Sequence, residues 1–249
     1  MMRVLDLFSG IGGFSLGLER AGMETVAFCE VDKEKQTVLR KRFPAVEIHE
    51  DIRSLNYDGH IDLICGGYPC QPFSVAGKQK GSKDKRHLWP EMLKQIRKHR
   101  PAWVIGENVK GHINKGLDRV LSDLEDLGYS TRAFCISAKA IGANHGRERV
   151  WIVAHSSSDG RYESTLTRGD GETDEHIPQR QDEDSHYEGR SSLRSLLEGT
   201  GYSPWGWGAK PPEIRVDDGL PNRMDRNRMM GEAVIPQIPQ IIGGIIYDL

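Results

Sequence analysis

Apolar and polar positions in the first 154 residues follow two alternating patterns. Short runs rich in β-branched and aromatic residues predict strands at 3–8, 25–30, 46–48, 61–65, 102–106, 131–136 and 149–154. Longer segments with apolar residues at helical spacing predict helices at 12–21, 33–43, 89–99 and 115–127. This alternation is typical of an α/β fold, in which a mostly parallel sheet is covered by helices on both faces. The last two strands are joined by too short a loop for a crossover helix, so we expect them to pair antiparallel at one edge.

The pattern changes after residue 154. Between residues 156 and 192 only a few sizeable apolar side chains stand among many Ser, Asp, Glu, Arg and Gly residues. Burial of so few apolar groups cannot offset the entropy lost on ordering, so we expect 156–192 to be flexible. The apolar residues of 230–246 predict a helix that returns to the first domain. We therefore predict a domain at 1–154, a short insert at 155–227 and a returning helix within 228–249.

Composition limits the class of protein. The four cysteines, at 29, 65, 70 and 135, form no Cys-x-x-Cys pair and no metal-like cluster with histidine. They indicate free thiols in a reducing cytoplasm and no metal site. We find no signal peptide and no apolar run long enough to span a bilayer, so we expect a soluble protein without a membrane partner.

Charge is unevenly distributed, although the net charge is only −2. Residues 78–119 carry 12 Lys or Arg against 4 Asp or Glu, whereas residues 159–190 carry 10 Asp or Glu against 4 Arg. The basic block suits a polyanionic substrate such as nucleic acid. An ordinary solvated helix face would give the same pattern, and charge alone does not decide between them.

The motif Gly66-Gly67-Tyr68-Pro69-Cys70-Gln71-Pro72-Phe73-Ser74 follows a predicted buried strand. Its glycines and Pro69 end the strand abruptly, which places Cys70 on a tight turn at the carboxyl end. Ligands of open α/β sheets bind at that edge. A single cysteine is more often an inert buried residue. Its place in this turn indicates a positioned nucleophile instead.

A glycine-rich turn, Ser9-Gly10-Ile11-Gly12-Gly13, joins the first predicted strand to a helix. Such a turn lets the backbone approach a nucleotide, but Ser15 stands where a dinucleotide pattern has its third glycine. Glu30, at the end of the second strand, suits the hydroxyls of a ribose, and Asp51 suits the exocyclic amine of an adenine. Together these features indicate an adenosine site without a diphosphate clamp, which favours S-adenosylmethionine over NAD.

Glu107 follows another predicted strand and is expected at the same edge as Cys70. A thiol and a carboxylic acid at one edge suit addition to an electron-poor ring, because the acid protonates the heteroatom that gains charge. Arg147 and Arg149 stand on alternate positions before the last strand, where they could hold a carbonyl or a phosphate. The alternative is that Glu107 is an ordinary surface acid and that the arginines form an ion pair with Glu148 or a neighbour.

In order and spacing, these motifs resemble those of the cytosine-5 DNA methyltransferases of bacteria and their phages. The matching stretches are 6–14, 30–32, 51–52, 69–71, 107–109, 147–149 and 231–236. The resemblance implies a Rossmann-like, S-adenosylmethionine-dependent methyltransferase sheet with an antiparallel edge strand, in a catalytic and cofactor-binding domain at 1–154. It implies that 155–227 is a small target recognition region and that the helix in 228–249 completes the fold.

The resemblance also assigns roles. Phe8 would stack on the adenine, and Glu30 would hold the ribose. The other residues implied at the cofactor are Gly10, Ile11, Gly13, Asp51, Ile52 and Pro69. Cys70 would be the nucleophile and Glu107 the acid at ring nitrogen 3, with Arg149, aided by Arg147, directed at the cytosine carbonyl. Residues 71–87 would form a loop that closes over duplex DNA, and the implied DNA contacts are Gln71, Ser74, Lys83, Lys85 and Arg86.

Two positions depart from the family pattern. His145 stands where the family has glutamine, and Glu232 where it has asparagine. The alternatives to a DNA enzyme are a tRNA cytosine-5 methyltransferase of the same fold and a catalytically impaired cofactor-binding relative. For the DNA enzyme we expect a nucleoid-associated monomer in the cytoplasm, either an orphan or paired with a separate restriction endonuclease.

Overall fold

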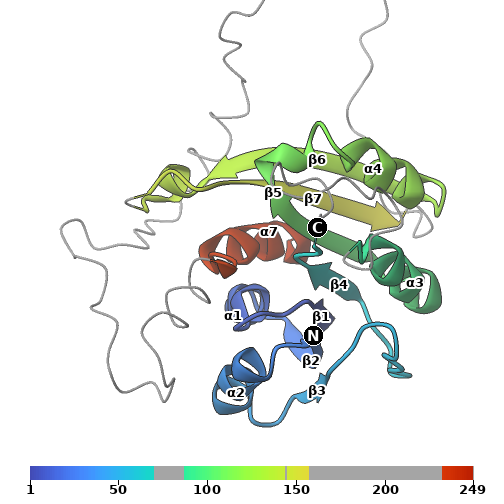
Figure 1. Cartoon of the computed structure of the whole chain (residues 1–249), viewed down its shortest axis with the longest axis vertical. Helices are drawn as coiled ribbons and strands as arrows, with labels where there is room; N and C mark the ends of the chain where they lie inside the picture. The colour runs from blue at the N-terminus through green and yellow to red at the C-terminus, as the bar shows by residue number, and fades with distance from the viewer. Residues whose placement is uncertain (70–86, 144, 157–231, 249) are drawn as a thin grey trace, which may run out of the picture.

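The fold is built on a seven-stranded mixed sheet (Figure 1). The computed structural model describes residues 1–69, 87–143, 145–156 and 232–248. Strand order across the sheet is β3-β2-β1-β4-β5-β7-β6. The strands are β1 (Arg3–Leu7), β2 (Glu24–Cys29), β3 (Glu47–His49), β4 (Leu63–Gly66), β5 (Trp103–Val109), β6 (Tyr129–Ser137) and β7 (Glu148–Ser156). The strands predicted within the first 154 residues are all present, with ends that shift by a few residues.

Strands β1 to β5 run parallel to one another, and β7 is antiparallel to both of its neighbours, β5 and β6. The expected mostly parallel sheet and the antiparallel pairing of the last two strands are therefore confirmed. The reversed strand β7 lies one place in from the edge, and β6 forms the edge itself. Between β6 and β7 the chain makes only the short 3₁₀ turn η3 (Ala138–Ile141), too short for a crossover that would keep them parallel.

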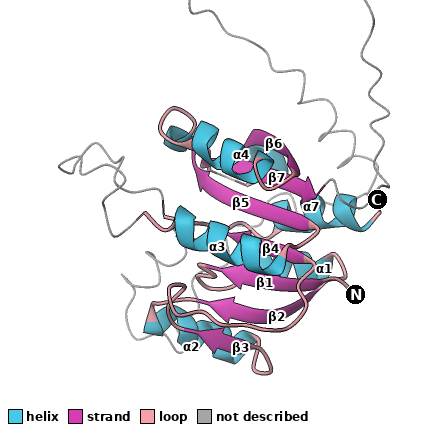
Figure 2. Cartoon of the chain, turned by 90° about the vertical axis from the view of Figure 1, so that its right-hand side faces the viewer, coloured by secondary structure: helices cyan, strands magenta, loops and turns pink. Residues whose placement is uncertain are grey.

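Helices cover both faces of the sheet (Figure 2). They are α1 (Gly13–Arg20), α2 (Lys33–Arg42), α3 (Trp89–His99), α4 (Leu117–Glu125) and α7 (Gln237–Tyr247). The apolar residues of α3 and α4 pack on one face with Leu5 and Leu7 of β1, whereas those of α1 and α7 pack on the other face with Val4. This division follows from the alternation of side chains along a strand. The helices predicted at 12–21, 33–43, 89–99 and 115–127 correspond to α1 to α4.

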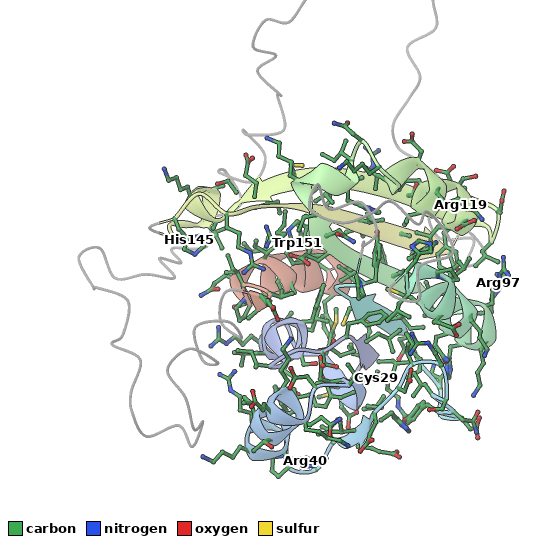
Figure 3. The ribbon with its side chains drawn as sticks, in the orientation of Figure 1. Cys29, Arg40, Arg97, Arg119, His145 and Trp151 are labelled. Atoms are coloured by element: carbon green, nitrogen blue, oxygen red, sulfur yellow. The ribbon has the colours of Figure 1, made fainter. Side chains whose placement is uncertain are left out.

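Trp151 of β7 is the largest fully buried side chain, and it lies between the sheet and α7 (Figure 3). Its ring meets that of Phe14 on α1 edge to face, with the ring centres 5.5 Å apart. One apolar cluster therefore joins β7, α1 and α7. Within the described ranges, no helix has both the length and the apolar composition that crossing a bilayer requires.

The carboxyl-terminal segment lies directly against the backbone of α1. Gly13 and Gly17 face the carbonyl oxygens of Val234 and Pro236 so closely that a Cβ at either glycine would collide with them. A backbone oxygen cannot rotate away as the end of a side chain can. The position of the segment before α7 therefore depends on two glycines far away in sequence.

We predict that Gly17→Ala destabilises the protein by about 1 to 3 kcal/mol, the usual cost of overpacking. Gly244→Ala is the matched control, because Gly244 lies on α7 with nothing within 4 Å of a built Cβ. This control should be neutral or stabilising by up to about 1 kcal/mol, since alanine has the higher helix propensity. Urea unfolding measures both changes. Equal stabilities for the two variants would contradict the close approach of α1 and 234–236.

Candidate functional site

The candidate site lies at the carboxyl edge of the sheet. Strands β1, β2, β4 and β5 are parallel and therefore end at this edge. Strand β7 runs the other way and begins there, with Arg149 opposite Val109 of β5. This edge thus receives the exits of the parallel strands β1 to β5 and the entry of β7.

The turn after β1 has an unusual backbone. Phe8 and Gly10 both adopt left-handed conformations, with φ of 56° and 58°. The conformation is strained for Phe8 and free of strain for a glycine. The Ser9 hydroxyl donates to the Asp6 carbonyl at 2.6 Å and fixes the turn from inside. Apart from its two chain neighbours, no described residue has an atom within 4 Å of a built Cβ at Gly10, so the described structure leaves space beside this backbone.

Glu30 connects this turn to the exit of β2. Its Oε2 accepts the Gly10 N–H at 2.7 Å, and its Oε1 accepts the Asp32 N–H at 2.9 Å. The residue is only 7% exposed, so the carboxylate is held in one orientation. A carboxylate has about four acceptor positions and these contacts use two of them, which leaves acceptors for two hydroxyls. The open backbone at Gly10 and this oriented acceptor fit the ribose of a nucleoside cofactor.

Asp51 and Ile52 lie after β3 and differ in their surroundings. The Asp51 Oδ1 accepts the Arg53 N–H at 2.9 Å, and its Oδ2 lies 3.2 Å from the guanidinium of the same arginine. The Asp51 side chain is partly exposed, whereas Ile52 is buried in the apolar cluster on the α3 side of the sheet. Asp51 therefore has an oriented carboxylate at the surface, and Ile52 supports it from the core.

Glu107 lies at the exit of β5 and is 8% exposed. Its Oε1 is 3.0 Å from Arg149 Nε and 4.0 Å from Arg147 Nη2. Burial raises the pKa of Glu107, although both arginines act to lower it. A built Cβ at Gly67 would be 3.2 Å from Glu107 Oε2, so the carboxyl group reaches the exit of β4. Glu107 is therefore a buried acid whose neighbour in space is the chain that leads into Cys70.

Of the alternative ion pairs, with Glu148 or with a neighbour, the structure shows one with a neighbour, between Arg149 and Glu107. Glu148 pairs instead with Lys110 at 2.8 Å, and Arg149 pairs with Glu107. Arg147 donates to two backbone carbonyls of the carboxyl-terminal segment, Ala233 at 2.8 Å and Glu232 at 3.1 Å. The sequence contained no signal for these contacts, which join residues more than 80 positions apart.

A buried pair, Tyr68 and His112, was also missed by the sequence analysis. The Tyr68 hydroxyl and His112 Nε2 are 2.9 Å apart. The Tyr68 ring lies against the rings of Trp89 and His112, with centres 5.0 and 5.5 Å away. The Asn108 amide donates to the Tyr68 carbonyl at 2.9 Å. The backbone two residues before Cys70 is thus fixed by contacts from α3 and from the chain after β5.

Three of the four cysteines have surroundings that disfavour the thiolate. Burial raises the pKa of Cys29 to about 12 and that of Cys65 well above its usual value. The pKa of Cys135 is also raised, again chiefly by burial. Because the thiolate is the reactive form, none of these three has the environment of a nucleophile. Within the described ranges, no three His, Cys, Asp or Glu side chains gather as metal ligands would.

Part of the predicted site lies outside the described residues. Pro69 ends the described chain after β4. The residues beyond it that were assigned to catalysis or DNA binding are Cys70, Gln71, Ser74, Lys83, Lys85 and Arg86. Most of the insert predicted at 155–227, including the flexibility expected for 156–192, also lies outside them. Those roles and domain boundaries stay predictions.

Comparison with known proteins gives the family. Residues 2–209 match the family model described as C-5 cytosine-specific DNA methylase. The chain belongs to this family. A similar curated methylase, Type II methyltransferase M2.BsuMI of Bacillus subtilis, is 36% identical over 167 residues, which are 64% of this chain and 43% of that protein. Type II methyltransferase M.HhaI of Haemophilus parahaemolyticus is 38% identical over 160 residues, 61% of this chain and 48% of that protein. The chain spans about half the length of these methylases or less.

Solved structures agree with the methylase fold. A DNA modification methyltransferase encoded within an E. coli prophage superimposes with a TM-score of 0.55 at 28% identity, covering 64% of this chain and 47% of that one. The DNMT2 mutant of Spodoptera frugiperda gives the same TM-score at 23% identity, over 72% of this chain and 56% of that one. At that identity the second likeness concerns the fold alone. Together with the strand order, these matches confirm the predicted Rossmann-like methyltransferase sheet.

We predict that His112 makes the protein acid-sensitive. Burial, with a smaller contribution from His87, lowers the pKa of His112 to about 4 from 6.5. Between these values the unfolded chain binds a proton that the folded chain does not, so stability is lost as pH falls from 6.5 towards 4. Relative to His112→Gln, the wild type should lose about 1 to 3 kcal/mol more between pH 7 and pH 4.5.

Urea unfolding at the two pH values measures the difference. The glutamine amide can still hydrogen-bond to the Tyr68 hydroxyl but does not titrate. Burial also raises the pKa of Asp6 to about 7, which has the opposite effect on stability, but Asp6 is present in both proteins and cancels. Tyr68→Phe is the control, because it removes the hydroxyl and leaves His112 to titrate. Identical pH dependence in wild type and His112→Gln would show that His112 is not held neutral.

Proposed function

We propose that the chain is a DNA cytosine-5 methyltransferase that uses S-adenosylmethionine and a covalent Cys70 adduct. The observation that carries this proposal is the buried Glu107. Its carboxyl group pairs with Arg149 and lies beside Gly67, three residues before Cys70. An acid paired with a cation, beside the chain that leads to a cysteine, suits addition of a thiol to a pyrimidine ring. The names of the curated relatives, both Type II methyltransferases, support methyl transfer, and the family description supports cytosine in DNA as its target.

The reaction begins with exposure of the target base. Carbon 5 of a cytosine is inaccessible inside a duplex, so the base has to be flipped out at a cost of a few kcal/mol. The basic residues of 78–119 are suited to holding the phosphates on either side. Lys83, Lys85 and Arg86 of this block are proposed as contacts to the DNA backbone, and Gln71 and Ser74 as further DNA contacts.

The addition step joins Cys70 to the ring. The Cys70 thiolate forms a bond to carbon 6, and the electron pair displaced from the 5,6 double bond would accumulate at ring nitrogen 3. Protonation of nitrogen 3 by Glu107 neutralises this charge. The raised pKa of Glu107 helps it to keep a proton for this purpose. Arg149 can donate to the cytosine carbonyl, because its contacts to Glu107 and Glu148 leave other guanidinium N–H groups.

The transfer step makes use of the activated carbon 5. S-adenosylmethionine, when bound, supplies the electrophilic methyl group that carbon 5 accepts. Glu30 would hold its ribose hydroxyls, with Gly10, Ile11 and Gly13 beside it and Phe8, Asp51, Ile52 and Pro69 around its adenosine. Transfer would release S-adenosylhomocysteine. Loss of the carbon 5 proton to solvent then restores the double bond, Cys70 leaves carbon 6 as a thiolate, and nitrogen 3 returns its proton to the Glu107 carboxylate.

The family departures are compatible with an active site that is still assembled. Glu232, which replaces asparagine, pairs with Lys35 at 2.8 Å and offers its carbonyl to Arg147. His145, which replaces glutamine, lies in the loop before β7 (Figure 3). Its Nδ1 accepts the backbone N–H of Arg147 at 3.4 Å. These contacts support a working enzyme over an impaired relative. Duplex DNA is the proposed partner, in a cytoplasmic monomer whose restriction endonuclease, if it has one, is a separate protein.

Glu107→Gln should slow methyl transfer to duplex DNA by roughly a hundredfold or more, as loss of a positioned acid does. Single-turnover transfer of labelled methyl groups measures the rate, and calorimetry with S-adenosylhomocysteine should show unchanged cofactor affinity. Glu148→Gln is the matched control, since this exposed carboxylate stands at the same end of β7 and pairs with Lys110. It should react at the wild-type rate.

Two results would count against the proposal. A wild-type rate for Glu107→Gln would remove this residue from the mechanism. Methylation of a tRNA transcript, with none on mixed-sequence duplex DNA, would promote the tRNA alternative.

A further inference from the structure

Two basic side chains from distant elements hold the segment that precedes α7. Arg147, before β7, donates to the carbonyls of Glu232 and Ala233 at 3.1 and 2.8 Å. Lys35, in the first turns of α2, pairs with the Glu232 carboxylate at 2.8 Å. The backbone and the side chain of one residue, Glu232, are therefore each bound by a different cation.

The same segment is held sterically on its other side. The carbonyls of Val234 and Pro236 lie against Gly13 and Gly17 of α1, with no room for a Cβ at either glycine. Helix α1 begins directly after the turn that contains Gly10. A shift of the segment would therefore be transmitted to the backbone of that turn.

The ion pair between Lys35 and Glu232 also connects the segment to the proposed cofactor site. Helix α2 is capped by the Asp32 carboxylate, which accepts the N–H groups of Glu34 and Lys35. The Asp32 N–H in turn donates to Glu30 Oε1. The lysine side chain is mostly covered, with 16% exposed, whereas Glu232 is 56% exposed. Lys35 is therefore connected through Asp32 to Glu30, the residue proposed to bind the ribose.

Arg147 and Arg149 differ in what they touch. Arg149 Nε lies 3.0 Å from Glu107, a direct ion pair, whereas Arg147 reaches the same oxygen only at 4.0 Å. Two nitrogens of Arg147 are used by the carbonyls, and its buried Nε has no hydrogen-bond partner among the described residues. The side chain is 17% exposed. Its contacts are thus chiefly to the protein's own backbone.

We propose that Arg147 is a positioning residue that, together with the Lys35–Glu232 pair, holds 232–236 and thereby the shape of the cofactor site. This assignment replaces the sequence-based prediction that Arg147 assists Arg149 on the substrate. This role rests on the proposed function, which supplies S-adenosylmethionine as the cofactor and Glu107 as the acid. Cofactor affinity can nevertheless be measured without methyl transfer, so the two can be tested separately.

The first experiment compares Arg147→Lys with Arg149→Lys. A lysine keeps the charge but cannot bind two carbonyls with a planar fork. Arg147→Lys should weaken binding of S-adenosylhomocysteine about tenfold by calorimetry and lower the saturated single-turnover rate by less than threefold. Arg149→Lys should do the reverse, with cofactor affinity within twofold of wild type and a rate reduced about a hundredfold. A merely structural effect would not separate affinity from rate in this way.

The second experiment exchanges the charges of the ion pair between Lys35 and Glu232. Lys35→Glu and Glu232→Lys should each weaken S-adenosylhomocysteine binding several-fold, and the double variant should recover at least half of the loss. Lys33→Glu is the matched control in the same turn of α2, because Lys33 is 64% exposed and pairs with Glu50 instead. It should bind like the wild type.

The outcomes separate the two proposals. Wild-type cofactor affinity in Arg147→Lys, or no recovery in the charge-exchanged double variant, would overturn the positioning role. The predicted affinity pattern without methyl transfer by any of the proteins would leave that role standing and would overturn the proposed function.

Discussion

The reversal of β7 is the constraint on which the site depends. If β7 were parallel to β5, its last residues would lie at the carboxyl edge. Arg149, near the start of β7, would then lie at the opposite edge of the sheet. Because β7 runs against β5, its entry faces the exit of β5, with Arg149 in register with Val109. Only this arrangement brings a guanidinium within 3.0 Å of the Glu107 carboxylate. A buried carboxyl group at the end of a strand is tolerable because a cation is fixed beside it.

The two acidic side chains of the edge are prepared for different tasks by their surroundings. Glu30 accepts backbone N–H groups from two loops and is therefore oriented as an acceptor. Glu107 is buried and has two arginines beside it. Burial has the larger effect on its pKa and raises it, whereas the arginines lower it. One carboxylate thus organises the proposed cofactor turn, and the other is suited to hold a proton near the chain that leads to Cys70. The carboxyl-terminal segment touches both sides of this edge, through the α1 glycines next to the cofactor turn and through Arg147 next to Arg149.

Much of this fold is encoded locally and could be predicted from sequence. The alternation of apolar residues located the strands and helices of 1–154, and the edge carrying Glu30 and Glu107 followed from the direction of parallel strands. The contacts of Tyr68 with His112 and of Lys35 with Glu232 could not be predicted, because they join residues that come together only when helices pack. The same holds for the two carbonyls bound by Arg147, since backbone acceptors have no signature in a sequence. The role of Cys70 rests on its motif and on the surroundings of Gly67 and Tyr68.

The central claim is that Cys70 becomes covalently joined to a cytosine, and trapping that adduct tests it most directly. In duplex DNA that contains 5-fluorocytosine, fluorine cannot leave carbon 5 as a proton does, so the adduct should accumulate in the presence of S-adenosylmethionine. Denaturing electrophoresis and mass spectrometry should show a protein–DNA conjugate through Cys70 for the wild type and for Cys135→Ser, in which an exposed thiol is removed. Cys70→Ser should give none, because a hydroxyl adds poorly to carbon 6. A conjugate that persists in Cys70→Ser, or that maps to another residue, would contradict the account.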